Sequence, residues 1–180
     1  KQDCENGEQV KHYFFRMGIH LFLAYALSAS DLHGENFLAC GEYPVLLDFE
    51  TLPGYAGAAD GETVDKQISN YINSSVLKTG ILPELIWGGN GAIVSALSTG
   101  ATVRTPFRMP VIKNQGTSEM YIEHEPVELT FSGCVVTCKG EVMQPLDYQE
   151  EICAGFTSAY RTYLADTSIR KAMEPFFEAR

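Results

Sequence analysis

The sequence has no long hydrophobic run and few basic residues. No apolar stretch approaches the roughly 18 residues that a membrane helix requires, and no signal peptide is visible. Lysine and arginine number 13 against 23 aspartate and glutamate residues, for a formal net charge of -10. Phosphate contacts need clustered basic residues, so this balance argues against nucleic acid as a partner. It still allows one nucleotide, held at a local site with a metal.

The cysteines provide no disulfide framework. There are five of them, an odd number at irregular spacings, which favours a reducing cytoplasm. Cys134 and Cys138 resemble half of a zinc site, but no second Cys or His pair lies at ligand spacing. We therefore interpret them as small buried side chains. Hydrophobic residues make up 45% of the 180 residues and charged residues 20%, which is typical of one globular domain.

Hydrophobic periodicity predicts a helix first and a β-hairpin after it. The helix runs from about Glu8 to Ser28, starts near Asn6-Gly7, and is apolar nearly all round in its second half, which predicts burial. The predicted strands are Phe37–Cys40 and Val45–Leu47, with Gly41–Pro44 as their turn.

The rest of the chain predicts an α+β layout. A loop over Gly54–Gly61 precedes a helix over Thr63–Lys78 that Gly80 and Pro83 end, while Gly88–Gly100 stays unassigned. Three apolar segments predict a small sheet before two final helices. The predicted strands and helices are Met120–Ile122, Val127–Phe131, Cys134–Thr137, Tyr148–Leu164 and Thr167–Ala179. We divide residues 1–180, taken as a single unit, into a catalytic-loop core (1–100), a β-rich segment (101–147) and a helical segment (148–180).

A cluster of polar residues surrounds the predicted hairpin. Asp31 and Asn36 are five residues apart in the loop after the first helix, and Asp48 and Glu50 follow the second strand. Protein kinases place an Asp and an Asn at this offset and a magnesium-binding Asp further on. A carboxylate can orient an attacking hydroxyl, and hard oxygen ligands hold magnesium against phosphates. The pattern favours a metal-phosphate site over an ordinary hairpin with a charged rim.

Departures from the protein-kinase pattern narrow the prediction. Ala29-Ser30 replaces the His-Arg that precedes the Asp, and His33 follows Asp31 by two residues. Asp-Leu-His-x-x-Asn resembles the corresponding loops of lipid kinases and of aminoglycoside phosphotransferases. His33 has a structural alternative as a loop histidine bonded to backbone, and we interpret His12, His20 and His124 as structural. Glu35 and Glu42 are interpreted as surface or turn residues, and Arg104 and Arg108 as surface ion-pair residues.

The wording of this region, "DLHGENFLACGEYPVLLDFETL", closely resembles the dehydratase domain of class II lanthipeptide synthetases (LanM enzymes). The resemblance extends through "FFRMGIHLFLAYALSASD", "SVLKTGILP" and "YQEEICAGFTSAY", and is weakest over residues 101–145. It implies a kinase-like fold, nearer to lipid kinases, of which this chain would be a C-lobe fragment.

By this resemblance the full enzyme uses ATP and Mg²⁺ to phosphorylate Ser and Thr of a precursor peptide. It then eliminates phosphate to leave dehydroamino acids. The resemblance implies that Asp31 acts on the substrate hydroxyl and that His33 lies beside the transferred phosphate. Asn36 and Asp48 would hold the nucleotide's metal, with Glu50 as a further metal ligand.

Several parts of such an enzyme are missing from the sequence. No Gly-rich loop or nucleotide-binding Lys precedes Asp31, and no Arg/Thr elimination motif or zinc-dependent cyclase is visible. The chain starts at Lys1 rather than Met and stops at Arg180 without a terminating signal. We therefore expect an excerpt that is inactive alone and partnered by the remaining synthetase, including a nucleotide-covering lobe before Lys1 and the elimination motif after Arg180.

Two other functions are compatible with parts of this pattern. A small-molecule kinase of the aminoglycoside phosphotransferase type would share the Asp-x-His-x-x-Asn loop and leave a stable phosphorylated product. The sequence elements around Asp48 favour a lanthipeptide synthetase over such a small-molecule kinase. A non-catalytic, peptide-docking pseudo-kinase is opposed by the joint presence of Asp31, Asn36 and Asp48.

Overall fold

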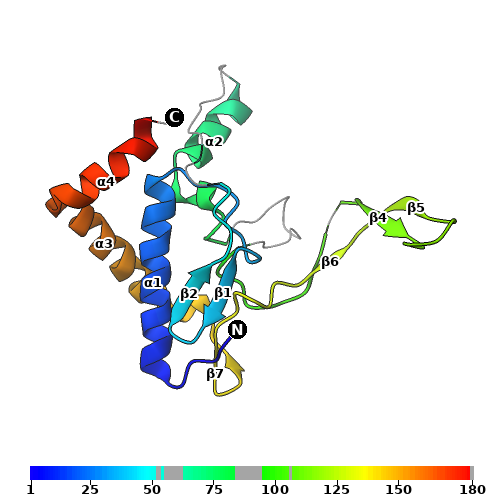
Figure 1. Ribbon diagram of the computed structural model, residues 1–180, viewed down its shortest axis with the longest axis horizontal. Coiled ribbons are helices and arrows are strands. Elements are labelled where there is room, and N and C mark those ends of the chain that lie inside the picture. The colour runs from blue at the N-terminus through cyan, green and yellow to red at the C-terminus, as the bar shows by residue number, and fades with distance from the viewer. Residues whose placement is uncertain (52–53, 55–62, 84–94, 106, 179–180) are drawn as a thin grey trace.

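The first helix, α1 (Gly7–Ala26), lies at the centre of the fold. A computed structural model describes residues 1–51, 54, 63–83, 95–105 and 107–178. Asn6 caps the helix as predicted, because its Oδ1 accepts the N–H of Gln9 at 3.0 Å. Figure 1 shows α1 between α3 (Gln149–Ala165) on one side and the hairpin of β1 (Phe37–Cys40) and β2 (Tyr43–Leu46) on the other.

The other elements confirm an α+β arrangement. In chain order they are α2 (Val64–Asn73), the 3-10 helix η1 (Val76–Thr79), β3 (Val103–Arg104), β4 (Met109–Lys113), β5 (Tyr121–Glu125), β6 (Glu128–Leu129), β7 (Thr137–Cys138), β8 (Glu141–Val142), the 3-10 helix η2 (Pro145–Tyr148) and α4 (Thr167–Glu178). The predicted helix over Thr63–Lys78 is present as α2 and η1, and Gly80 ends η1 with a φ of 76°. The loop over residues 55–61 and the unassigned residues 88–94 lie outside the described residues.

Two glycines let α3 approach α1 closely. A Cβ on Gly18 would overlap the carbonyl of Ile152, and one on Gly155 would overlap the carbonyl of Phe15. Beyond this crossing, the ring of Phe22 contacts the rings of Phe156, Tyr160 and Tyr163. Phe156, Tyr160 and Tyr163 therefore lie on the face of α3 that packs against α1.

The core lies around α1, and it draws on distant parts of the sequence. Val10, Phe14 and Met17 on α1 are fully buried, and Phe14 stacks on Tyr148 with ring centroids 4.6 Å apart. The segment Cys134–Val136 is buried against them, and the Tyr13 hydroxyl donates to the Cys134 carbonyl at 3.4 Å. This burial raises the pKa of Tyr13 well above its usual range, so the hydroxyl stays protonated.

The expected burial of the second half of α1 holds only in part. Leu21, Phe22 and Ala24 are buried, whereas Leu23 and Tyr25 are exposed. The predicted small-sheet content is present, and in the described residues it is divided among two-stranded antiparallel sheets. Of the predicted strand Cys134–Thr137 only Thr137 belongs to a strand, β7, while Cys134–Val136 is buried in the core outside any strand.

The hairpin turn is shorter than predicted. It consists of Gly41 and Glu42, and Pro44 lies inside β2 opposite Ala39. A proline has no N–H to contribute to a ladder. It is tolerated because the N–H of Ala39 donates instead to Gly133 at 2.9 Å, on the other side of β1.

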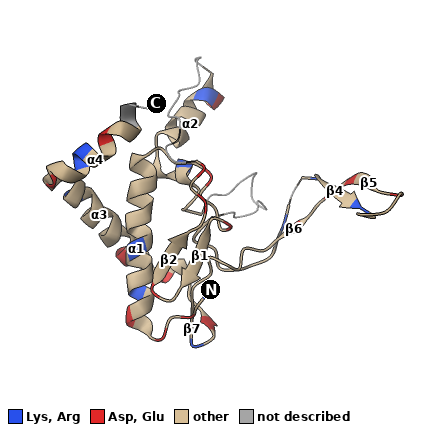
Figure 2. Ribbon diagram, in the orientation of Figure 1, with Lys and Arg blue, Asp and Glu red and all other residues tan. Residues whose placement is uncertain are grey.

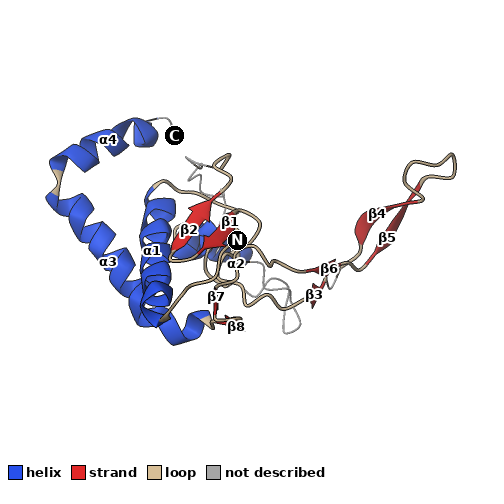
Figure 3. Cartoon of the chain, turned by 60° about the horizontal axis from the view of Figure 1, so that its bottom comes forward, coloured by secondary structure: helices blue, strands red, loops and turns tan. Residues whose placement is uncertain are grey.

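Residues 103–130 form an arm that leaves this body, as Figures 1 and 3 show from two directions. In the arm, β3 pairs with β6 near the root and β4 pairs with β5 at the tip, both antiparallel. None of the helices described has the length and hydrophobicity that crossing a membrane requires.

Candidate functional site

The loop that carries Asp31 is anchored on both sides of that residue. The N–H of Ala29 donates to the carbonyl of Ala24 in α1, at 2.8 Å. The N–H of Leu32 donates to the carbonyl of Thr79 in η1, also at 2.8 Å, and the Leu32 side chain is buried. Asp31 itself is exposed. The loop therefore presents the Asp31 carboxylate to solvent from a fixed backbone.

Asn36 holds the backbone of Asp31. Its Nδ2 donates to the carbonyl oxygen of Asp31 at 2.7 Å. Asp31 has a φ of 61°, in the left-handed region that Asp and Asn tolerate better than most residues. The predicted pair is thus brought together by the structure, through the amide nitrogen of Asn36. Because the nitrogen is used in this way, the amide oxygen is the atom of Asn36 that remains for a ligand.

His33 faces Asp31 from within the same loop. Its Nε2 lies 3.8 Å from Oδ1 of Asp31, and its Nδ1 accepts the N–H of Glu35 at 3.2 Å. A neutral imidazole that accepts at Nδ1 carries its proton on Nε2, the nitrogen that lies on the side of Asp31. The alternative interpretation of His33, as a loop histidine bonded to backbone, applies to Nδ1, which is bonded to Glu35. Nε2 lies beside Asp31 and belongs to the candidate site.

Asp48 is joined to this loop through the hairpin. The N–H of Leu47 donates to the carbonyl of Asn36 at 2.8 Å, one step beyond the β1–β2 pairing of Phe37 with Leu46. Asp48 therefore directly follows a residue that is hydrogen-bonded to the loop of Asp31 and Asn36. Its Oδ1 accepts the N–H of Glu50 at 2.9 Å, which fixes a tight turn at the strand end.

The oxygen atoms in this region suit a hard cation. Carboxylate and amide oxygens are the ligands that magnesium prefers. Among the described residues, no three His, Cys, Asp or Glu side chains gather as a metal site. The predicted magnesium ligands are not such a group of three, because they combine the amide of Asn36 with the carboxylates of Asp48 and Glu50. Oγ1 of Thr51, the residue after Glu50, is buried and has no hydrogen-bond partner in the described part of the chain.

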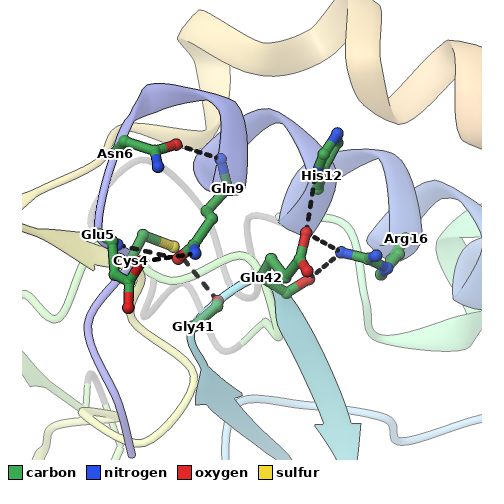
Figure 4. Close-up of polar contacts among 8 residues, drawn as sticks. All are labelled: Cys4, Glu5, Asn6, Gln9, His12, Arg16, Gly41 and Glu42. Carbon is green, nitrogen blue, oxygen red and sulfur yellow. Dashed lines mark hydrogen bonds and ion pairs between the residues drawn. The ribbon is translucent and has the colours of Figure 1, made fainter.

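The far end of the hairpin is fastened to α1 by charge (Figure 4). Glu42 accepts from Arg16 at 2.9 Å and contacts Nδ1 of His12 at 2.6 Å, and Arg16 also donates to the Glu42 carbonyl at 2.7 Å. The hydrogen bonds from Arg16 and then from His12 hold the pKa of Glu42 below its usual range. Arg16 lies over the ring of Tyr43, 4.3 Å from its centroid.

Glu42 is thus a turn residue, as predicted, but it also has a structural role that the sequence did not reveal. The only signal was the spacing of His12 and Arg16, which lie four residues apart on one helix face. With Leu47 bonded to the loop and Glu42 bonded to α1, the hairpin that leads to Asp48 is fixed at both ends.

The other candidate residues lie elsewhere. Glu35 is exposed in the loop turn, as predicted. Arg104 and Arg108 lie on the arm, where Nε of Arg108 donates to the carbonyl of His124 at 2.7 Å. His20 is bonded to the Pro44 carbonyl at 3.2 Å, and burial lowers its pKa. Cys134 is buried, whereas Cys138 is partly exposed.

Comparison with known families matches residues 1–178 to a family described as "Domain of unknown function (DUF4135)". The match covers nearly the whole chain. The chain belongs to the DUF4135 family. All of the candidate site residues, from Asp31 to Glu50, fall inside the matched range.

This DUF4135 chain is also similar to a curated protein, the "Lacticin 481/lactococcin biosynthesis protein LcnDR2" of Lactococcus lactis subsp. lactis. The two are 27% identical over an alignment of 172 positions, and the alignment covers 89% of this chain. The chain spans only 18% of the length of that protein. The match confirms the resemblance to lanthipeptide synthetases that residues 30–52 carry.

Proposed function

We propose that residues 1–180 belong to the dehydratase part of a lanthipeptide synthetase. The full polypeptide would phosphorylate Ser and Thr of a precursor peptide and eliminate the phosphate, giving dehydroamino acids. It would act in the cytoplasm, together with a nucleotide-covering lobe and a cyclase domain of the same chain. The similarity to a lacticin 481/lactococcin biosynthesis protein supports this role.

The observation that carries the proposal is the convergence on one loop of groups that phosphoryl transfer requires. Asp31, His33 and Asn36 are linked directly, and Leu47 links the loop to Asp48. The Asp31 carboxylate would accept the proton of the attacking Ser or Thr hydroxyl, since it is exposed and its backbone is fixed. Nε2–H of His33 would donate to an oxygen of the transferred phosphate.

The oxygens of Asn36, Asp48 and Glu50 would hold the metal. When bound, Mg²⁺ with ATP would supply the phosphoryl group and neutralise its charge. The Asn36 amide is oriented by its bond to Asp31, and the Asp48 carboxylate by the N–H of Glu50. These two hydrogen bonds orient two of the three proposed ligands and support the proposal.

The test uses the full-length polypeptide, ATP, Mg²⁺ and the precursor peptide, followed by mass spectrometry of the peptide. Losses of water are expected. Asp31→Asn should slow the phosphorylation by about 10²–10⁴-fold, the range for a general base. Asp48→Asn should abolish it, because an amide is a weaker magnesium ligand than a carboxylate.

Glu35→Gln is the matched control, since Glu35 is an exposed acid of the same loop with no assigned role. It should keep full activity. Unchanged activity in Asp48→Asn would contradict the metal assignment. A stable phosphopeptide that never loses phosphate would instead identify a plain kinase.

A further inference from the structure

The peptide bond that joins Asp31 to Leu32 is held at both ends. The Asp31 carbonyl accepts Nδ2 of Asn36 at 2.7 Å, and the Leu32 N–H donates to the Thr79 carbonyl at 2.8 Å. A peptide unit is planar, so hydrogen bonds at its two ends fix its orientation. Asp31 has a φ of 61°, a conformation that persists only where the surroundings hold it. The direction in which the Asp31 side chain leaves the backbone therefore depends on these contacts.

Gly80 lies against the same peptide bond. A Cβ built on Gly80 would lie 3.0 Å from the Leu32 nitrogen, closer than ordinary van der Waals contact, and 3.4 Å from the Asp31 carbonyl carbon. Gly80 also has a φ of 76°, which a residue with a side chain adopts only with strain. The position thus favours glycine for two separate reasons, and only the first of them concerns the loop of Asp31.

The backbone at Thr79 is fixed by the hydroxyl of the same residue. Oγ1 of Thr79 donates to the Val76 carbonyl at 2.8 Å and accepts the Ile81 N–H at 3.2 Å. Thr79 and Ile81 are both buried, so a bond lost here would not be replaced by one to water. The Thr79 carbonyl that accepts from Leu32 is therefore held in one place.

We propose that Thr79 and Gly80 are positioning residues for Asp31. They fix the Asp31–Leu32 peptide, and through it the point from which the carboxylate reaches the substrate hydroxyl. The inference rests on the part of the proposed function in which Asp31 accepts the proton of that hydroxyl. Figure 2 shows acidic positions on the loops at the end of the β1–β2 hairpin away from its turn, the end at which Asp31 and Asp48 lie. A shift of the Asp31 peptide would also change the distance between these two carboxylates.

The kcat for phosphorylation of the precursor peptide by the full-length polypeptide tests the contact at Gly80. Because about 1 Å of misplacement can cost about 10²-fold in rate, Gly80→Ala should lower kcat about tenfold. Gly140→Ala is the matched control, since Gly140 has a φ of 82° and nothing lies within 4 Å of a Cβ built on it. The control should keep the kcat of the parent. Equal losses in the two variants would overturn the proposal.

The same substitutions in an Asp31→Asn background separate positioning from stability. A residue that acts through Asp31 loses its effect once the carboxylate is gone, so Gly80→Ala should leave the residual rate unchanged there. A merely structural role would lower the rate by the same factor in both backgrounds, and that result would overturn the proposal.

A pair of variants tests the hydroxyl of Thr79. Thr79→Val keeps the shape of the side chain but leaves the buried Ile81 N–H without its acceptor, so kcat should fall several-fold. Thr79→Ser keeps the hydroxyl and should restore the kcat of the parent. Equal kcat values in the two variants would overturn the positioning role of Thr79.

Hydrogen exchange followed by mass spectrometry examines the loop without ATP or peptide. Exchange in residues 28–36, which include the Leu32 amide, should be faster in Gly80→Ala than in the parent and unchanged in Gly140→Ala. Unchanged exchange in Gly80→Ala would overturn the proposal at any level of activity. Faster exchange together with full activity of Asp31→Asn would contradict the proposed function instead, and the contact of Gly80 with the loop would stand.

Discussion

The body of the molecule and its arm are ordered by different physical means. In the body, Gly18 and Gly155 allow two helices to touch, and side chains from the whole chain fill the core around α1. In the arm, strand pairing and a buried threonine at the root give order, while large apolar side chains stay exposed. The body therefore fixes the backbone of the loop and hairpin that carry the candidate site residues, whereas the arm leaves large apolar side chains in contact with solvent.

The largest expected effect tests whether body and arm unfold independently. Gly155→Ala should lower the free energy of unfolding by about 3 kcal/mol, because its methyl group meets the backbone of α1. Gly116→Ala, at the arm tip, has open space around its Cβ and a φ of 82°. Its strain of about 1 kcal/mol should stay local and leave the melting temperature of the body almost unchanged. Thermal unfolding followed by circular dichroism measures both.

Gly7→Ala controls for helix propensity, since Gly7 begins α1 and also has open space around it. It should be neutral or slightly stabilising. If Gly116→Ala lowered the melting temperature as much as Gly155→Ala, body and arm would form one cooperative unit, and the comparison would fail.

Much of the body could be predicted from the sequence because its signals are local. The 3.6-residue periodicity of α1 and α3 reflects one buried face, and the Asn6 cap precedes α1 directly. The spacing of Asp31 and Asn36 likewise reflects a single loop, and the structure joins the two by a hydrogen bond. Their catalytic and metal-binding roles remain predictions.

The arm and the long-range contacts could not be predicted in this way. β4 contains Pro110, which interrupts the usual strand pattern, and β3 finds its partner β6 only across the whole length of the arm. The bond from Leu32 to Thr79 and the ion pair of Arg16 with Glu42 join residues that are far apart in sequence. The local sequence around each residue does not identify its partner, even where, as with His12 and Arg16, it places two basic side chains on one helix face.

A smaller effect is expected from two ion pairs, one in each region. Glu42→Gln removes the charge that Arg16 and His12 share, and should lower the melting temperature because the hairpin loses its tie to α1. Glu125→Gln removes the Lys113 pair on the arm and should leave the melting temperature unchanged. Differential scanning calorimetry at low and high salt distinguishes them. An equal decrease for both variants would mean that the arm contributes to the cooperative core.

The smallest expected effect is a pH dependence that belongs to the body alone. Burial lowers the pKa of His20 below its usual value of 6.5, while its ring contacts Phe37 and its Nε2–H donates to the Pro44 carbonyl. Between the two pKa values the unfolded chain binds the proton and the folded chain does not. The stabilisation by neutral His20 is therefore complete above pH 6.5 and is lost as the pH falls through the lower, folded pKa. The slope is a fraction of the roughly 1.4 kcal/mol per pH unit that one full proton would give.

Urea unfolding between pH 7.5 and about 5 should show this slope in the parent chain and in His124→Gln, whose histidine is exposed on the arm. His20→Gln keeps a donor for Pro44 but cannot be protonated, so its slope should be smaller; an unchanged slope would assign the pH dependence to other groups.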